Sequence, residues 1–202
     1  EKLLLWTEVA LKAAYTIQLL HKSRQGLRYI LAATPDLHKI QPLADLLQGI
    51  LVQVTGLLGA VHSFLALLPD GGVPRHTEGS EGCVAVMEDD TELIVRASTG
   101  RFEGHTSLER QLDDDRVRMV QQALRQGEIL IQNNTTVVPL RVSDLTLGVI
   151  YLDRPAVLDQ DIELLHVFAN QAAVAIRNSQ LYELATVDRL TGAYVRRFFE
   201  QW

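Results

Sequence analysis

The first 34 residues most constrain the fold, because their apolar spacing is that of a helix. Residues 2–33 contain no proline and a single glycine, Gly26, so they predict one long helix. Its apolar residues recur at alternating steps of three and four, a period that lets two helices keep their apolar seams in contact. These seam positions are Leu3, Trp6, Ala10, Ala13, Ile17, Leu20, Leu27 and Leu31, interrupted once by Arg24.

Two interpretations of this helix are open. It could pack along its own domain through the apolar stripe, or it could form a stalk that pairs with a second copy of the chain. At about 1.5 Å per residue it would be roughly 48 Å long, more than a small domain covers, which favours the stalk. Thr34-Pro35 is expected to end the helix, since proline disfavours helical geometry in the residue before it.

Composition excludes several classes of function. The chain has 202 residues with 19 Lys and Arg against 25 Asp and Glu, a formal charge of −6 that argues against a nucleic-acid partner. The sequence contains no uninterrupted apolar run of about 18 residues, so it predicts no membrane span. A single cysteine, Cys83, excludes an internal disulfide framework and is typical of a reducing cytoplasm, so we expect a cytoplasmic protein.

The middle of the chain alternates between helical and strand patterns. Helical spacing recurs from Leu43 to Leu58, after Asp113–Asp115 and again from Asp159, the expected N-cap of a last helix of about 25 residues. Residues 69–82 predict a loop. The order predicts an α+β domain, an antiparallel sheet with helices on one side, flanked by long N- and C-terminal helices. Its expected strands are Ala60–Leu68, Val84–Met87, Leu93–Ala97, Ile129–Ile131, Thr136–Arg141 and Leu145–Leu152.

Three stretches resemble the GAF family of sensory and dimerisation modules. Leu27–Ala60 is similar to the start of such a domain, and Pro139–Pro155 followed by Asp161–Glu183 is similar to its end. The chain also resembles a GAF-like domain that often follows phosphoacceptor receiver domains. The apolar spacing predicts a helical stalk at 1–34, and the resemblance, which covers roughly residues 27–185, implies a GAF domain with its C-terminal signalling helix at 35–185.

Residues 186–202 are expected to be a linker and the start of a further domain. Ala185–Trp202 resembles the opening of a GGDEF domain, the diguanylate cyclase fold that makes cyclic di-GMP from two GTP molecules. Val195 departs from the family, which usually has asparagine there. Every catalytic element of that fold would follow Trp202. The resemblance therefore implies that this chain is itself not catalytic and holds no cofactor. GTP and Mg²⁺ would be bound by the following domain. The residues that match its opening turn are Asp188, Leu190, Thr191 and Gly192.

No residue cluster predicts a metal site. Asp113–Asp115 could suggest one, but three consecutive carboxylates diverge on a helix and suit its positive N-terminal end. The six histidines include no pair four residues apart. Within the GAF family, bilin binding requires a cysteine often followed by histidine, and Val84 follows Cys83. The family's methionine-sulfoxide reductases need several cysteines, and the single Cys83 of this chain is too few.

A small-molecule pocket is the remaining candidate site. By position in a GAF domain, its guanidinium, aromatic and hydroxyl groups would suit an anionic or purine ligand. The alternative is a pocket filled by the chain's own side chains. The residues expected to line it are Arg101, Phe102, His105, Thr106, Ser107 and Val120.

The last helix predicts a second dimer contact. Leu165, Ala169, Ala172 and Ile176 continue the three-four spacing, and the alanines would let a partner helix approach closely. We expect a homodimer in which the first and last helices form a parallel bundle that controls a GGDEF output domain. The alternatives are a ligand-free scaffold ahead of a degenerate GGDEF domain, and the GAF sensor of a transcription regulator.

Overall fold

The computed structural model describes residues 11–12, 41–69, 93–102, 108–156 and 158–186. Their main feature is a five-stranded antiparallel sheet in the order β2-β1-β5-β4-β3. The strands are β1 Ser63–Leu67, β2 Ile94–Thr99, β3 Leu130–Gln132, β4 Thr135–Val142 and β5 Leu145–Leu152, and the helices are α2 Leu43–Leu58, the short η1 Leu108–Arg110, α3 Asp114–Gln126 and α4 Asp159–Thr186. The α+β class and the antiparallel sheet are therefore confirmed.

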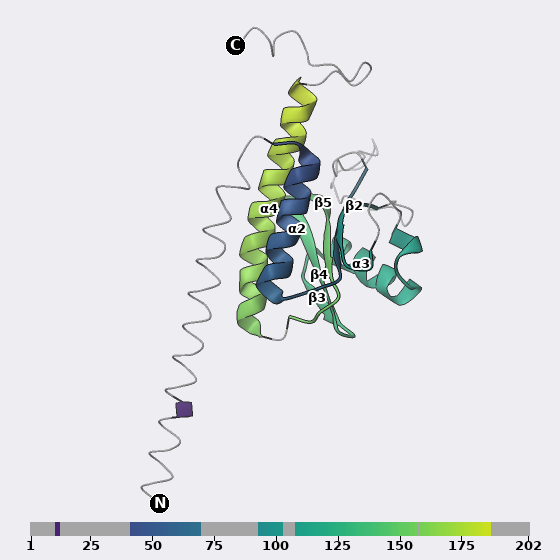
Figure 1. Ribbon diagram of the computed structural model, residues 1–202, viewed down its shortest axis with the longest axis vertical. Coiled ribbons are helices and arrows are strands. Elements are labelled where there is room, and N and C mark those ends of the chain that lie inside the picture. The colour runs from purple at the N-terminus through teal and green to yellow at the C-terminus, as the bar shows by residue number, and fades with distance from the viewer. Residues whose placement is uncertain (1–10, 13–40, 70–92, 103–107, 157, 187–202) are drawn as a thin grey trace, which may run out of the picture.

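Helices cover both faces of the sheet, which corrects the expectation that they gather on one side. Two helices, α2 and α4, lie on one face and α3 lies on the other (Figure 1). Strand β5 serves both layers, because its side chains alternate: Ile150 and Leu152 join the core under α2 and α4, while Val149 and Tyr151 join the core under α3. Fully buried strands at the centre of the sheet explain the long apolar run in β1.

The helix boundaries follow from their end residues. Helix α2 ends at Gly59 and α3 ends at Gly127, both in left-handed geometry, with φ of 65° and 68°. Asp113 caps α3, because its carboxylate accepts a hydrogen bond from the backbone N–H of Arg116 at 2.9 Å. Asp159 is the first residue of α4 rather than its cap, since the carbonyl of Leu158 accepts the first hydrogen bonds.

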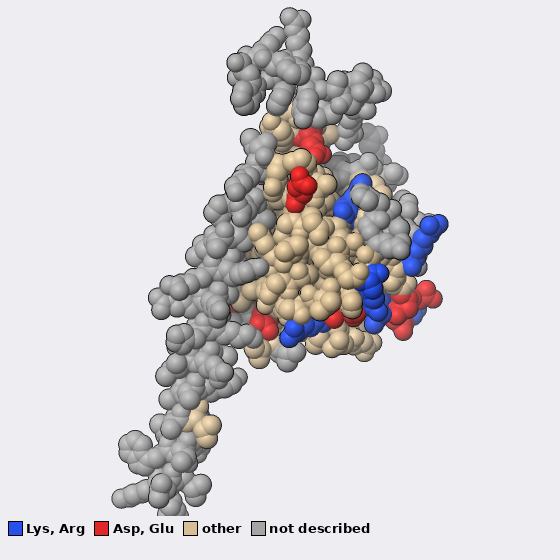
Figure 2. Space-filling model, viewed as in Figure 1, with Lys and Arg blue, Asp and Glu red and all other residues tan. Residues whose placement is uncertain are grey.

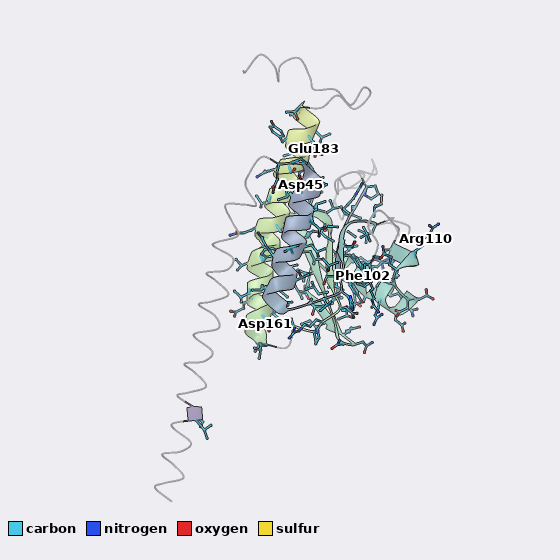
Figure 3. All side chains as sticks on the ribbon, in the orientation of Figure 1. Asp45, Phe102, Arg110, Asp161 and Glu183 are labelled. Carbon is cyan, nitrogen blue, oxygen red and sulfur yellow. The ribbon has the colours of Figure 1, made fainter. Side chains whose placement is uncertain are left out.

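Helices α2 and α4 run antiparallel and are joined at one end. In Figure 3, Asp45 and Glu183 lie at the same end of the helix layer and Asp161 lies at the other. Pro42 precedes α2 and offers no side-chain cap, but a carboxylate oxygen of Glu183 accepts a hydrogen bond from the N–H of Leu43 at 3.2 Å. A carboxylate there complements the positive end of the α2 dipole and ties it to the last turns of α4.

The other ends of these helices are held through Arg154. Its guanidinium donates to the carbonyl of Gly59 at 2.9 Å, and its own carbonyl accepts from the hydroxyl of Thr136 at 2.7 Å. The same hydroxyl accepts from the N–H of Ala156 at 2.8 Å. The connection from β5 to α4 is therefore fixed to both α2 and the sheet.

Several expectations concern residues that lie outside the described ranges. These are the seam of the first helix (Leu3, Trp6, Ala10, Ala13, Ile17, Leu20, Leu27 and Leu31), the strand Val84–Met87 with Cys83, and the turn Asp188, Leu190, Thr191 and Gly192. Among the helices that the structure does describe, none combines the length and apolar character needed to cross a membrane.

Gly148 in β5 allows the central strands to approach. A Cβ atom at this position would lie 2.1 Å from the carbonyl oxygen of Ala66 and 2.9 Å from the Cα of Leu67. Both are backbone atoms of β1, which cannot move aside without disturbing the sheet. We therefore expect Gly148→Ala to lower the free energy of unfolding by about 3 kcal/mol or more, measured by urea denaturation.

Gly49→Ala in α2 is the matched control. A Cβ at Gly49 would meet nothing within 4 Å, so alanine should raise the free energy of unfolding by about 0.5–1 kcal/mol through its better helix propensity. Equal effects of the two substitutions would show that the close approach of β1 and β5 does not limit stability.

Candidate functional site

The α3 side of the sheet is built around three aromatic rings in mutual contact. Phe64 and Tyr151 lie parallel with ring centres 4.8 Å apart, and Phe102 meets both of them edge-on at 5.0 and 5.6 Å. All three rings are buried in one apolar cluster that also includes Val120 of α3. Offset stacking and edge-to-face contacts are the favoured arrangements of such rings. This part of the layer is therefore a packed core.

The structure describes three of the six residues expected to line a pocket, and it places them in the apolar core or in an ion pair. Phe102 and Val120 belong to that core, and Arg101 forms an ion pair with Asp153 at 2.8 Å. The backbone N–H of Arg101 also donates to Nδ1 of His62 at 3.2 Å. These contacts fix the end of β2 against β5. The other three predicted residues, His105, Thr106 and Ser107, lie outside the described residues.

The structure instead shows a cleft between α3 and the turn that joins β3 to β4. Its volume is about 370 Å³, within the usual range of small-molecule sites. The helix side of the cleft comprises Asp113, Asp115, Arg116, Arg118, Met119 and Gln122, and the turn side comprises Gln132, Asn133 and Thr135. None of the described residues predicted for the pocket, Arg101, Phe102 or Val120, lines it.

Local sequence explains how each side of the cleft is positioned. Asp115, Arg118, Met119 and Gln122 lie three, four and seven residues apart and so share one face of α3. Asn133 and Asn134 both have positive φ, 45° and 65°, as the two central residues of a tight hairpin turn require. Asparagine tolerates this geometry, and it places Asn133 at the cleft.

Thr135, which lines the cleft, shares a hydrogen bond with a second hydroxyl, that of Tyr151. Oγ1 of Thr135 lies 3.3 Å from the phenol oxygen of Tyr151, and both residues are buried. Burial raises the pKa of Tyr151 above the ordinary 10.0 of a tyrosine, while the hydrogen bond to Thr135 acts in the opposite direction. The phenol therefore stays neutral to a higher pH in the folded chain than in the unfolded chain.

The acidic run Asp113–Asp115 has structural roles in this arrangement. Asp113 caps the helix, and its other oxygen lies 3.5 Å from the guanidinium of Arg116. Asp115 pairs with Arg118 on the helix surface. Among the described residues, no three His, Cys, Asp or Glu side chains gather closely enough to hold a metal ion. Of the histidines, the structure describes His62 and His166.

The residues of the last helix that the sequence predicts at a dimer contact are buried inside the chain. Leu165, Ala169, Ala172 and Ile176 are at most 5% exposed and pack in the core between α4, α2 and the sheet. Three-four spacing marks the apolar face of a helix but does not say what covers it. Here the chain's own sheet covers it, so these four residues cannot contact a partner.

Sequence comparison then decides the family. Residues 8–184 match the family described as "Domain of unknown function (DUF3369)".
The chain belongs to the DUF3369 family.
No curated protein matches this DUF3369 chain.

Solved structures show that the DUF3369 fold is that of a GAF domain. The GAF domain of an Acinetobacter phosphoenolpyruvate-protein phosphotransferase matches with a TM-score of 0.59 at 16% identity, covering 79% of this chain and 98% of that chain. The GAF domain of a putative sensor histidine kinase from Pseudomonas syringae pv. tomato matches at 0.52 and 16%, covering 85% and 96%. Free methionine-R-sulfoxide reductase from Neisseria meningitidis, in complex with its substrate, matches at 0.56 and 12%, covering 80% and 93%. The expected GAF fold is therefore confirmed.

Tyr151 provides a test of this site through pH. An unfolded tyrosine ionises near pH 10, whereas folded Tyr151 holds its proton to higher pH. The folded state then binds more protons than the unfolded state above about pH 10. The contribution of Tyr151 to the free energy of unfolding is therefore complete below about pH 10. It is lost as the pH rises further, by up to about 1.4 kcal/mol per pH unit.

Tyr151→Phe should remove this loss of stability at alkaline pH. At neutral pH the variant should lose about 0.5–1.5 kcal/mol of unfolding free energy, because phenylalanine cannot form the hydrogen bond with Thr135. Urea denaturation between pH 7 and 11 measures both effects. Tyr182→Phe is the control, because Tyr182 is exposed on α4 and should leave the alkaline slope unchanged. An unchanged slope in Tyr151→Phe would contradict the buried neutral phenol.

Proposed function

We propose that this chain is a non-catalytic sensory and dimerisation module of a cytoplasmic signalling protein, and that it passes the state of its cleft through α4 to a diguanylate cyclase domain. The observation that carries the proposal is the apolar outer face of α4. Among the described residues, eight large apolar side chains are exposed, and five of them lie on this helix. They are Val167, Val174, Leu181, Tyr182 and Leu184.

The spacing of these residues is that of a helix seam. Val167, Val174 and Leu181 are seven residues apart and are 40–46% exposed, and Leu184 follows three residues later. We call these four residues the outer seam of α4. Asn170 and Arg177 lie between them and make the seam partly polar, a feature that sets register in paired helices at some cost in stability. The outer seam can therefore pair with a second copy, and the pairing should depend on concentration.

The surroundings of the outer seam also favour pairing. Figure 2 shows an uncharged area over α2, with charged side chains at its margins. Val52 of α2 is 54% exposed, and Gly49, three residues before it, has no neighbour within 4 Å of where a Cβ would lie. A second helix layer could pack over this uncharged area, and Arg177 is then the charged residue within the seam itself.

The cleft has a direct covalent and packing route to α4. Thr135 at the cleft contacts Tyr151 of β5, and β5 leads through residues 153–158 into α4. Glu183 near the end of α4 caps α2, and the two helices share one apolar core, so they are connected to each other along their length. A ligand that displaces Thr135 or Tyr151 would thus shift the base of the helix that carries the outer seam.

The identity of the output domain rests on the sequence. Ala185–Trp202 resembles the opening of a GGDEF domain, whose active form joins two GTP molecules with Mg²⁺ and so needs two domains face to face. A dimer through α4 would bring two such domains together. Of the matching GAF folds, one comes from a putative sensor histidine kinase, a regulatory setting.

Val174→Glu tests the dimer. Light scattering should give the unmodified chain a mass approaching twice 22.6 kDa as concentration rises. Val174→Glu should stay near 22.6 kDa at the same concentrations, because two carboxylates would face each other in the seam. Val61→Glu is the matched control, since Val61 is also exposed but precedes β1. A monomer at all concentrations, or equal masses for both variants, would contradict the proposal.

The same pair of variants tests the output. In a protein that carries this module with its following domain, we expect cyclic di-GMP formation from GTP to fall at least tenfold with Val174→Glu and less than twofold with Val61→Glu. If the unmodified protein forms no product although the chain dimerises, the cyclase assignment is wrong and the dimerisation module stands.

A further inference from the structure

The charges on the helix side of the cleft are balanced. Asp113 and Asp115 supply two carboxylates, and Arg116 and Arg118 supply two guanidinium groups. Each arginine pairs with the aspartate three residues before it. Arg116 is the more enclosed arginine, with 32% of its side chain exposed against 73% for Arg118.

This balance favours a ligand that carries both charges. A lone anion would meet two carboxylates, and a lone cation would meet two guanidinium groups. A molecule with separate positive and negative groups can pair with both the aspartates and an arginine of the helix, so that its own charges are both matched. Its carboxylate would pair with Arg116, and its ammonium group would pair with the carboxylates of Asp113 and Asp115.

The turn side of the cleft adds neutral hydrogen-bonding groups. The side-chain amides of Gln132 and Asn133 both line the cleft, and neither pairs with another side chain in the described part of the chain. Each amide offers donors and an acceptor. They can therefore bind a polar group without first breaking an internal hydrogen bond.

In the described part of the chain, the hydroxyl pair of Thr135 and Tyr151 has one donor without a partner. Thr135 and Tyr151 each carry one O–H hydrogen, and only one of the two can lie between their oxygens. Neither hydroxyl has another partner among the described residues. When Tyr151 donates to Thr135, the hydrogen of the Thr135 hydroxyl has no partner among the described residues, and Thr135 is one of the residues that line the cleft. An acceptor atom of a ligand would satisfy it.

The remaining lining argues against other ligand classes. None of the described residues that line the cleft is aromatic, so a nucleobase would find no ring to stack on. Met119 supplies the one apolar side chain among them, which is too little surface for an apolar ligand and enough for a short aliphatic group.

We propose that the cleft between α3 and the β3–β4 turn binds a small zwitterion of the free amino acid class, with Arg116 on its carboxylate, aspartates on its ammonium group, and Asn133 and Thr135 on its polar atoms. This inference rests on the proposed sensory function and names the class of molecule sensed.

Thermal unfolding and calorimetry of the 202-residue chain test the class of ligand. The probes are the twenty L-amino acids added singly, inorganic phosphate, adenosine and calcium chloride. At least one amino acid should raise the melting temperature by roughly 5–10 °C at about 100 times its Kd, and the other three probes should leave it unchanged. No response to any amino acid, or an equal response to phosphate, adenosine or calcium, would overturn the proposal.

Matched variants test the placement. Asn133→Gly and Asn134→Gly both keep the positive φ of the turn, but only Asn133 lines the cleft. With the responding amino acid, Asn133→Gly should weaken binding at least threefold and Asn134→Gly should not. Arg116→Gln should weaken it at least tenfold, and Arg96→Gln on β2 should not. Equal weakening by a variant and its control would overturn the assigned contacts.

Failure here can be separated from failure of the proposed function. If no amino acid binds while the unmodified chain dimerises through the outer seam, the ligand class is wrong and the dimerisation module stands. If an amino acid binds and the chain stays monomeric, the ligand class stands and transmission through α4 is wrong.

Discussion

Burial of the sheet on both faces is the constraint on which the structure depends. Strands β1 and β5 lie at its centre, and their side chains must fill two separate cores at once. The close approach of their backbones at Gly148 permits this. The alternation along β5 then assigns Ile150 and Leu152 to the α2–α4 layer and Val149 and Tyr151 to the α3 layer. In the described part of the chain, the sheet lies between the α2–α4 layer and α3.

The two layers differ in chemistry. The core of the α2–α4 layer is largely aliphatic, with Phe168 among its buried side chains, and the outer seam lies on its far side. The α3 layer combines an aromatic core with a polar, charge-balanced cleft. Figure 3 shows Phe102 and Arg110 on the α3 side, away from α4. Strand β5 connects the layers, since Tyr151 reaches the cleft through Thr135 and the chain then continues into α4. This division suits a module that senses on one face and pairs on the other.

The sequence predicted the elements better than the site. Apolar spacing located α2, α3, α4 and all five strands that the structure describes. The helix ends were predictable because Gly59, Gly127 and Asp113 act locally. The side of the sheet that α3 covers was mispredicted, since local patterns do not specify which face a helix packs on.

The same limit explains the misassigned residues. Leu165 and Ile176 follow the three-four spacing of a seam, but that spacing marks the buried face of α4. The exposed face of the helix carries Val167, Val174 and Leu181, whose apolar pattern is less regular because polar residues interrupt it. The cleft depends on Thr135 and Asn133 of a hairpin lying beside α3. Two adjacent asparagines gave a turn signal, whereas their proximity to Arg116 is a tertiary property that no local pattern contains.

The central claim is that the outer face of α4 pairs with the same helix of a second copy. Distances measured between two copies of the chain test it most directly. Pulsed dipolar spectroscopy would use one spin label per chain, with Cys83 replaced by serine, at either His166 on α4 or Arg110 on the opposite side of the sheet. Paired helix axes lie about 8–10 Å apart, so the distance between labels at residue 166 should be much shorter than that at residue 110. The absence of any dipolar signal between copies, or a shorter distance at residue 110, would contradict the account.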